Sequence, residues 1–126
     1  MQKQGQKDRR ILVADDNREI ARRVAELLNE QEHISVVGPA RDGLEAVELY
    51  EAERPDTVVL DFDMPGLTGL EVLQRIRARD EACLIIILTA HSERGLRDRC
   101  LAEGADHFLS KSSDMDQLVD IVVTRR

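Results

Sequence analysis

Aromatic side chains are scarce in this sequence, and their scarcity limits the ligands that it can hold by stacking. The chain contains no tryptophan, one tyrosine and two phenylalanines among 126 residues. Single-stranded nucleic acids and many ring-shaped ligands are bound by stacking on aromatic side chains. The composition therefore argues against a stacking site.

Cysteine and long apolar runs are also scarce. Cys83 and Cys100 lie far apart, without a second cysteine or paired histidines at metal-ligand spacing. This excludes a zinc motif, argues against a disulfide framework and favours a reducing compartment. No apolar run approaches the ~20 residues that cross a bilayer, and residues 1–8 lack the apolar stretch of a secretory signal. We therefore expect a soluble, cytoplasmic protein.

The charge balance is acidic, with 25 acidic against 18 basic residues and a net charge of −7. An acidic domain binds phosphate backbones or anionic lipid only through a dense basic patch, and the sequence has none. We therefore expect no direct contact with nucleic acid and no membrane partner. The length and the 42% of apolar residues suit one domain with a substantial core.

Short apolar runs alternate with segments of helical periodicity along the chain. The runs predict strands at residues 11–14, 34–38, 57–60, 84–88 and 107–110, and the periodic segments predict helices at 18–30, 43–53, about 70–76, 93–103 and from 114 onward. Strict alternation favours right-handed crossovers and a parallel sheet covered on both faces. We predict a doubly wound five-stranded α/β domain over residues 10–124, with a disordered polar arm at 1–9 and a short tail at 125–126.

Four of the five predicted strands end in polar side chains that suit phosphoryl chemistry. These residues are Asp15 and Asp16, Asp61, Thr89 and Lys111. In open parallel sheets, ligands bind at the carboxyl ends of the strands. Clustered carboxylates repel one another unless a cation lies among them, and Mg²⁺ is the simplest hard ion with oxygen ligands. Each residue alone also fits a helix cap or a turn, so the prediction rests on the combination.

These residues resemble the receiver domains of two-component response regulators. That family has an acidic pair after the first strand, Asp-x-x-Met-Pro-x-x-x-Gly after the third, Thr or Ser followed by Ala after the fourth, and Lys after the fifth. Here the motifs read Asp15-Asp16, Asp61 to Gly69, Thr89-Ala90 and Lys111. The match covers about residues 10–124 and implies a flavodoxin-like fold with strand order 2-1-3-4-5. The wording of residues 36–47 looks most like receivers that precede helix-turn-helix output domains.

The resemblance implies a role for each residue of the acidic cluster. Asp61 would be the phosphoacceptor, whose carboxylate takes a phosphoryl group from a histidine kinase or a histidine phosphotransfer protein. Asp15, Asp16, Asp61 and the backbone carbonyl of Asp63 would hold Mg²⁺ or Mn²⁺, with Asp16 a more direct ligand than Asp15. The domain would assist its own phosphorylation and dephosphorylation without turning over a free substrate.

The resemblance also implies a switch. Lys111 would pair with a phosphoryl oxygen, and Thr89 would donate its hydroxyl to the phosphoryl group. Phe108 matches the switch aromatic of the family, which turns inward when the loop after Thr89 moves. The fourth helix, fifth strand and fifth helix would then form the surface that signals to a downstream partner, with a phosphorylation-dependent dimer as one outcome.

One position departs from the family pattern, and two others bear on phosphate lifetime. Family members usually follow the lysine with proline through a cis peptide, whereas this chain has Ser112. A cis bond before a residue other than proline costs ~3 kcal/mol, so the loop holds a strained bond or takes a trans route.

Asp63 and His91 lie two residues past Asp61 and Thr89, where the family tunes phosphate lifetime, although His91 equally fits an ordinary loop histidine.

Three alternatives stay open at this point. Asp61-Phe62-Asp63 also resembles the Asp-x-Asp motif of haloacid-dehalogenase-type phosphatases, but that family places it near the N-terminus and needs a late acidic pair. A second alternative keeps the fold and signals without phosphate, against which the intact Asp16, Asp61, Thr89 and Lys111 argue. The third concerns context, because a stand-alone receiver and a receiver excised from a longer regulator would end alike.

Overall fold

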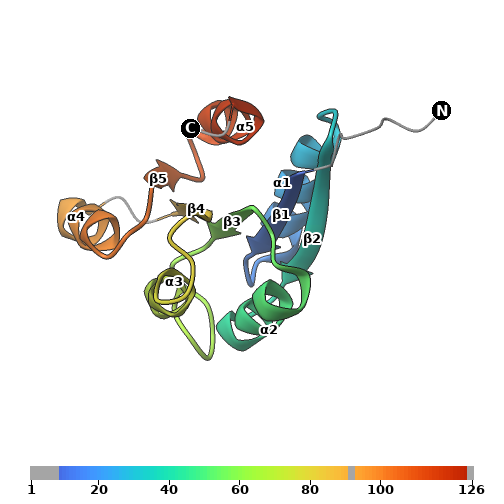
Figure 1. The fold of residues 1–126 in the computed structure, drawn as a ribbon. Helices are drawn as coiled ribbons and strands as arrows, with labels where there is room; N and C mark the ends of the chain where they lie inside the picture. The colour runs from blue at the N-terminus through green and yellow to red at the C-terminus, as the bar shows by residue number, and fades with distance from the viewer. Residues whose placement is uncertain (1–8, 91–92, 125–126) are drawn as a thin grey trace.

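The computed structural model describes residues 9–90 and 93–124, which form alternating strands and helices (Figure 1). The strands are β1 (Arg9–Ala14), β2 (Ile34–Ala40), β3 (Thr57–Leu60), β4 (Leu84–Thr89) and β5 (His107–Ser110), and the helices are α1 (Arg18–Asn29), α2 (Gly43–Glu53), α3 (Gly69–Arg77), α4 (Arg94–Ala102) and α5 (Met115–Thr124). The sheet has five parallel strands in the order β2-β1-β3-β4-β5. The predicted doubly wound fold and its strand order are confirmed.

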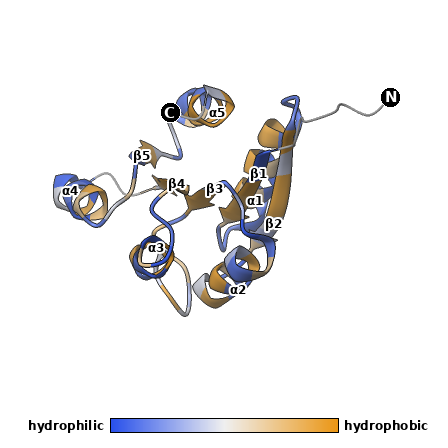
Figure 2. Cartoon of the chain, viewed as in Figure 1, coloured by the Kyte–Doolittle hydropathy of each residue, from blue (hydrophilic) through white to orange (hydrophobic). Residues whose placement is uncertain are grey.

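Helices cover both faces of the sheet (Figure 1). Helices α1 and α5 pack on one face through residues such as Val24 and Leu118. Helices α2, α3 and α4 pack on the other, where the core includes Tyr50, Leu73 and Cys100. The central strands are apolar along their length while the helices are apolar on one side only (Figure 2). This matches a sheet buried on both faces, whose strands carry near-continuous Val, Ile and Leu.

Two strands extend by more than one residue beyond the predicted apolar runs. Strand β2 continues past residue 38 to Ala40, because Ala40 pairs with Ala14 after a register shift and its carbonyl accepts the N–H of Asp15 at 2.9 Å. Strand β1 begins at Arg9, which pairs with Ile34. The pattern of apolar residues does not predict the start of β1 or the end of β2, because backbone pairing extends these strands through polar residues and proline. The rest of the predicted arm, residues 1–8, and the tail at 125–126 lie outside the described residues.

Side-chain caps fix where the helices next to the candidate site begin. The side chain of Asn17 accepts the N–H of Ile20 at the start of α1, directly after the acidic pair. Thr68 and Glu71 form a capping box at the start of α3. Each cap satisfies backbone donors that the first helical turn leaves without partners. The cap at Asn17 therefore begins α1 shortly after the end of β1, which leaves Asp15 and Asp16 at the edge of the sheet.

No helix among residues 9–90 and 93–124 has the length and apolar character needed to cross a membrane. Cys83 and Cys100 are both buried as free thiols, as expected for small apolar side chains. His91 lies outside the described residues.

Candidate functional site

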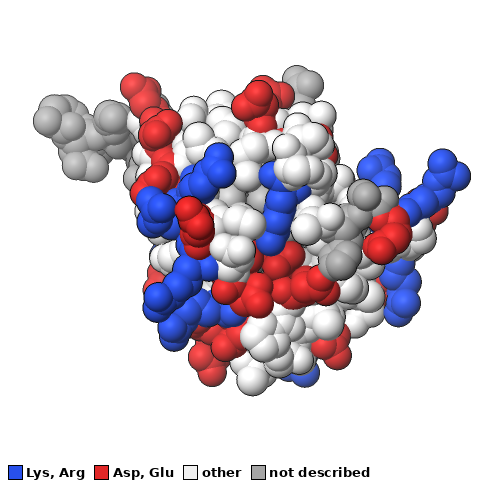
Figure 3. All heavy atoms as spheres, turned by 180° about the vertical axis from the view of Figure 1, so that it is seen from behind, with Lys and Arg blue, Asp and Glu red and all other residues white. Residues whose placement is uncertain are grey.

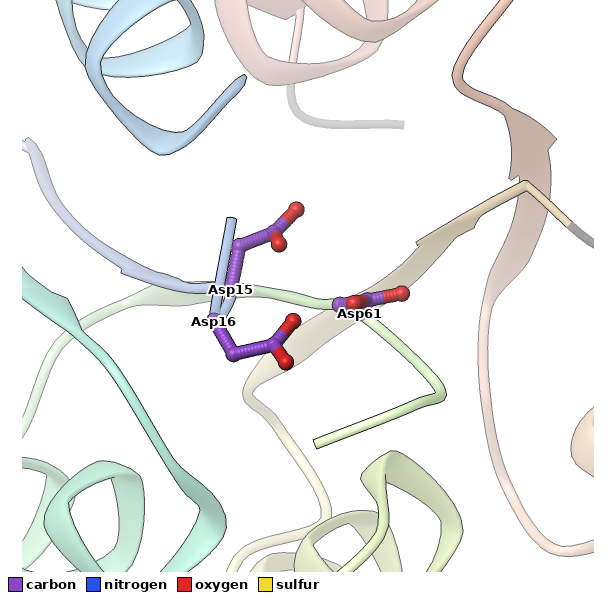
Figure 4. A group of neighbouring side chains, drawn as sticks. All are labelled: Asp15, Asp16 and Asp61. Atoms are coloured by element: carbon purple, nitrogen blue, oxygen red, sulfur yellow. The ribbon is translucent and has the colours of Figure 1, made fainter. Parts of the chain in front are cut away.

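Three carboxylates meet at the carboxyl end of the sheet (Figure 4). Asp15 and Asp16 follow β1, and Asp61 follows β3, the strand beside it. One oxygen from each residue lies within 4.8 Å of the others. Asp15 and Asp61 are buried, at 4% and 5% exposure, whereas Asp16 is exposed. The cluster is therefore open to solvent on the Asp16 side.

The ammonium of Lys111 joins two of these carboxylates. Its Nζ lies 2.7 Å from Oδ2 of Asp15 and 3.3 Å from Oδ2 of Asp61. All three side chains are largely withdrawn from solvent, with exposures of 11%, 6% and 6%. One ammonium cannot balance three carboxylates, so the cluster keeps an excess of negative charge.

Burial and the neighbouring charges both shift the pKa values in the cluster. Burial raises the pKa of Asp61 to about 6, and the charge of Asp15 adds to the effect. Lys111 and a backbone hydrogen bond from Asp63 act in the opposite direction. Burial by itself lowers the pKa of Lys111, but its hydrogen bond to Asp15 and the charges of both carboxylates outweigh burial, and the pKa lies above its usual range. A divalent cation would relieve this imbalance.

Asp15 and Asp16 differ in how their oxygens are used. Oδ1 of Asp15 accepts the backbone N–H of Asn17 at 2.8 Å, and Oδ2 accepts from Lys111. The described residues give the carboxylate of Asp16 no hydrogen-bond or ion-pair partner. Both oxygens of Asp15 are therefore engaged within the chain, whereas the carboxylate of Asp16 faces solvent.

Thr89 lies at the end of β4, next to the strand that carries Lys111. It is fully buried, and its register partner on β5 is Ser110. The backbone N–H of Lys111 donates to the carbonyl of Thr89 at 3.0 Å. The two residues that resemble the threonine and lysine of the receiver family are therefore joined through their main chains.

Phe108 stands apart from the carboxylates. It is half-buried and packs against the core on the side of α2, α3 and α4. Its side chain also lines a cavity of about 380 Å³ between α4, β5 and α5, together with Arg97, Leu101, Asp114 and Gln117. The predicted switch residue thus lies at the predicted signalling surface.

The site requires glycine at position 69. In the sequence, Gly69 is recognisable only as the last residue of the family motif that begins at Asp61. A Cβ at this position would overlap the carbonyl oxygen of Asp61 and would lie 2.9 Å from Cα of Phe62. The N–H of Gly69 donates to the carbonyl of Phe62 at 2.8 Å. The start of α3 therefore presses against the backbone that carries Asp61, and only glycine allows this approach.

The loop that holds Lys111 takes the trans route. Among the described residues the cis peptide bond joins Gly38 and Pro39, so the bond between Lys111 and Ser112 is trans. The chain therefore accommodates serine at the position of the usual proline without a strained peptide bond.

Charge of both signs is distributed over the face shown in Figure 3. Acidic side chains gather near its centre, and Lys and Arg lie to either side. This face is not uniformly basic, as a surface for a nucleic-acid backbone would be.

Comparison with known families identifies the chain. The sequence model of the response regulator receiver domain matches residues 11–123, which run from within β1 to within α5. The chain belongs to this family. It is therefore a receiver domain, and receiver domains are the signalling domains of two-component systems.

Curated relatives of this receiver domain are regulators of transcription. The transcriptional regulatory protein PdtaR of Mycobacterium tuberculosis is 38% identical over 120 residues, which cover 93% of this chain and 58% of that protein. The transcriptional regulatory protein DesR of Bacillus subtilis is 32% identical over 112 residues, which cover 89% of this chain and 55% of that protein. The chain thus spans a little over half the length of the curated relatives it matches.

Solved structures agree with the family. The receiver domain of the putative response regulator NarL from Mycobacterium tuberculosis superposes with a TM-score of 0.87 at 32% identity, covering 94% of this chain and 96% of that chain. A chain of the CheX–CheY–BeF3–Mg complex from Borrelia burgdorferi gives a TM-score of 0.84 at 27% identity, covering 93% and 88%.

Proposed function

We propose that this receiver domain accepts a phosphoryl group on Asp61 in a reaction that requires Mg²⁺ or Mn²⁺. The observation that carries the proposal is the cluster of Asp15, Asp16 and Asp61 with Lys111 bound to two of the three carboxylates. The donor is a histidine kinase or a histidine phosphotransfer protein. As its N–P bond breaks, an O–P bond to Asp61 forms and the imidazole leaves.

The donor set suits a hard divalent cation. One oxygen from each of the three carboxylates lies within 4.8 Å of the others, and carboxylate oxygens are the ligands that such a cation prefers. Asp15, Asp16, Asp61 and the backbone carbonyl of Asp63 would hold Mg²⁺, with Asp16 the most accessible. When bound, the ion neutralises charge on the phosphoryl oxygens.

Lys111 and Thr89 act on the group that Asp61 receives. The ammonium already lies 3.3 Å from Oδ2 of Asp61, so a phosphoryl oxygen on that carboxylate falls within its reach. There it would stabilise the charge of the transition state. Thr89 would donate its hydroxyl to the phosphoryl group. The carbonyl of Thr89 accepts the N–H of Lys111, so we expect a movement of one residue to affect the position of the other.

The output surface comprises α4, β5 and α5. Phe108 is half-buried at this surface and lines the cavity between the two helices, so an inward turn of its ring would change the shape of the surface. Phosphorylation would favour one of the two ring positions, which makes the surface a two-state element. Its target is a downstream protein or an output domain, and a phosphorylation-dependent dimer is compatible with the same switch.

The relatives and structural neighbours support these assignments by similarity. One neighbour is described as a complex with BeF3 and Mg, a pair that stands in for a phosphoryl group and its metal ion. Two relatives regulate transcription. We therefore propose that this domain acts in the cytoplasm, upstream of a transcriptional output that it controls without contacting nucleic acid itself.

The family assignment bears on the alternatives. A match to the receiver family over residues 11–123 favours a signalling domain over a haloacid-dehalogenase-type phosphatase. A phosphate-independent interaction module would have no need to keep Asp16, Asp61, Thr89 and Lys111 together. Multiple turnover of p-nitrophenyl phosphate would revive the phosphatase.

The proposal is tested by intact mass after incubation with acetyl phosphate and Mg²⁺. The chain should gain one phosphoryl group, and the gain should vanish with EDTA or in Asp61→Asn. Asp56→Asn is a matched control, because Asp56 precedes β3 and lies at the opposite end of that strand. An unmodified wild type that is folded and fails to bind beryllofluoride would contradict the proposal and favour the phosphate-independent module.

A further inference from the structure

Two hydrogen bonds fix the main chain on either side of Lys111. On one side, the peptide group between Ser110 and Lys111 is held by the Lys111 N–H, which donates to the carbonyl of Thr89 at 3.0 Å. On the other side, the N–H of Ser112 donates to Oγ of Ser110 at 3.2 Å. Because both peptide groups flanking its Cα are bound, the backbone torsions of Lys111 have little freedom.

Asp114 closes the same loop from its far end. Its Oδ2 accepts the N–H of Ser110 at 2.8 Å, while its own N–H donates to the carbonyl of Ser110 at 3.0 Å. The carbonyl of Asp114 accepts the N–H of Leu118, so Asp114 also begins the hydrogen bonding of α5. Ser110 is therefore bound through its N–H, its carbonyl and its hydroxyl, and it connects the end of β5 to the start of α5.

We infer that Ser110 is a positioning residue for Lys111. It acts through its hydrogen bonds within the loop at residues 110–114. The family usually places proline after the lysine, where a ring restrains the chain covalently. Proline has no N–H to donate, so it cannot make the bond that Ser112 makes here. In this chain the hydroxyl of Ser110 restrains the trans peptide by a hydrogen bond instead. The inference rests on the proposed function, because it concerns where the ammonium lies relative to Asp61.

Rigidity at this point matters because the ammonium sits at the end of a long side chain. Lys111 has four rotatable side-chain bonds, and its partners Asp15 and Asp61 are 2.7 and 3.3 Å away. A fixed backbone limits the entropy that is lost when the ammonium meets a phosphoryl oxygen. A displacement of about 1 Å in a catalytic group can cost up to about 100-fold in rate. Loss of one restraint should cost less, roughly tenfold.

The test compares phosphorylation rates by acetyl phosphate with Mg²⁺ in the full chain. Ser110→Ala removes the acceptor hydroxyl and should slow phosphorylation roughly tenfold. Ser110→Thr keeps the hydroxyl and should restore the rate to within about twofold. Ser112→Ala is the matched control, because it removes a neighbouring hydroxyl that contacts Ser110 at 3.0 Å but keeps the N–H that makes the restraining bond. It should match the wild type.

A double-mutant cycle separates positioning from a general effect on the fold. In the Lys111→Ala background, where phosphorylation is followed over longer times, Ser110→Ala should have no further effect. An equal slowing in both backgrounds, or a Ser110→Ala rate within twofold of wild type, would overturn the inference. If Ser110→Ala unfolds, Ser110→Cys replaces it, since a thiol of similar size accepts hydrogen bonds poorly.

The same experiments distinguish failure of the positioning role of Ser110 from failure of the proposed function. A wild type that acquires no phosphoryl group overturns both. A wild type that is phosphorylated, with Ser110 variants that all match it, overturns the positioning role alone. Exchange of the Ser112 amide hydrogen gives an independent readout, because it should quicken in Ser110→Ala and stay slow in Ser110→Thr.

Discussion

The ammonium of Lys111 lies closer to Asp15 than to Asp61, at 2.7 Å against 3.3 Å. Both carboxylates are buried, and Asp15 already accepts a backbone hydrogen bond from Asn17. Asp15 makes the shorter contact to the lysine, and Asp61 makes the longer one. This lysine joins two of the three carboxylates of the cluster through its ammonium group.

Lys111→Met should destabilise the metal-free protein. The substitution leaves the buried carboxylates of Asp15 and Asp61 without their cation, so we expect the free energy of unfolding to fall by about 2–4 kcal/mol. Addition of Mg²⁺ should recover part of the loss. Urea titration with and without Mg²⁺ measures both effects. Arg22→Met is the control, because the Arg22–Glu26 pair is exposed and should be worth less than about 0.5 kcal/mol.

Asp61→Asn should have the opposite effect in the absence of metal. The pKa of Asp61 is about 6 in the folded chain against an ordinary 3.8, so folding favours the protonated form. The stability that the protein has while the Asp61 carboxyl is protonated is fully present below about pH 4 and is lost as the pH rises through 6. At pH 7 the variant should be about 2 kcal/mol more stable than the wild type, and the difference should shrink towards pH 4. A difference that does not vary between pH 4 and 7 would contradict this assignment.

The hydrogen bond between Tyr50 and Asp80 should make the stability of the protein depend on pH in the alkaline range. The hydroxyl of Tyr50 donates to Oδ2 of Asp80 at 2.7 Å. Burial, together with this bond, raises the pKa of Tyr50 to about 12 from 10.0. The contribution of the neutral phenol is therefore complete below about pH 10 and is lost as the pH rises through 12.

The comparison with Tyr50→Phe isolates this contribution. The variant should lose about 1 kcal/mol at pH 7. The gap between the two proteins should close between pH 10 and 12, because Tyr50 is the only tyrosine of the chain. Chemical denaturation at a series of pH values measures the gap, and a constant gap over that range would speak against the hydrogen bond.

Gly69→Ala should damage the fold next to the acceptor. The new Cβ would overlap the carbonyl of Asp61, so the start of α3 or the end of β3 must move. We expect a loss of more than about 2 kcal/mol in stability and slower phosphorylation. Gly95→Ala is the matched control on α4, where a Cβ meets nothing within 4 Å. It should gain about 0.5–1 kcal/mol, because alanine favours the helix. Equal effects at the two sites would refute the steric argument.

The sequence predicts both the parallel sheet and the polar residues that meet at the carboxyl ends of its strands, for one physical reason. Parallel strands bring their carboxyl ends to the same edge, so residues far apart in the chain, such as Asp15, Asp61 and Lys111, meet whenever each follows a buried strand. No knowledge of side-chain packing is needed for this step. The helix caps observed at Asn17 and Thr68 are contacts between residues close in the sequence.

Other features depend on contacts between segments and are not visible in the sequence. Asp15 is buried and paired with Lys111, nearly a hundred residues away, whereas the adjacent Asp16 is exposed. The end of β2 is set by pairing of Ala40 with Ala14, which carries the strand beyond its apolar run. The hydrogen bonds that Ser110 makes to Ser112 and Asp114 around Lys111 are likewise contacts that no sequence pattern shows. The roles of Thr89 and Phe108 as a switch stay predictions.

Chemical trapping of the acceptor tests the central claim most directly. Borohydride reduces an aspartyl phosphate to homoserine, which peptide mass spectrometry distinguishes from aspartate. After incubation with acetyl phosphate and Mg²⁺, we predict homoserine at residue 61 and aspartate at residues 15, 16 and 63. Homoserine at any of those three positions, or a phosphoryl adduct on the chain with residue 61 unreduced, would contradict the account.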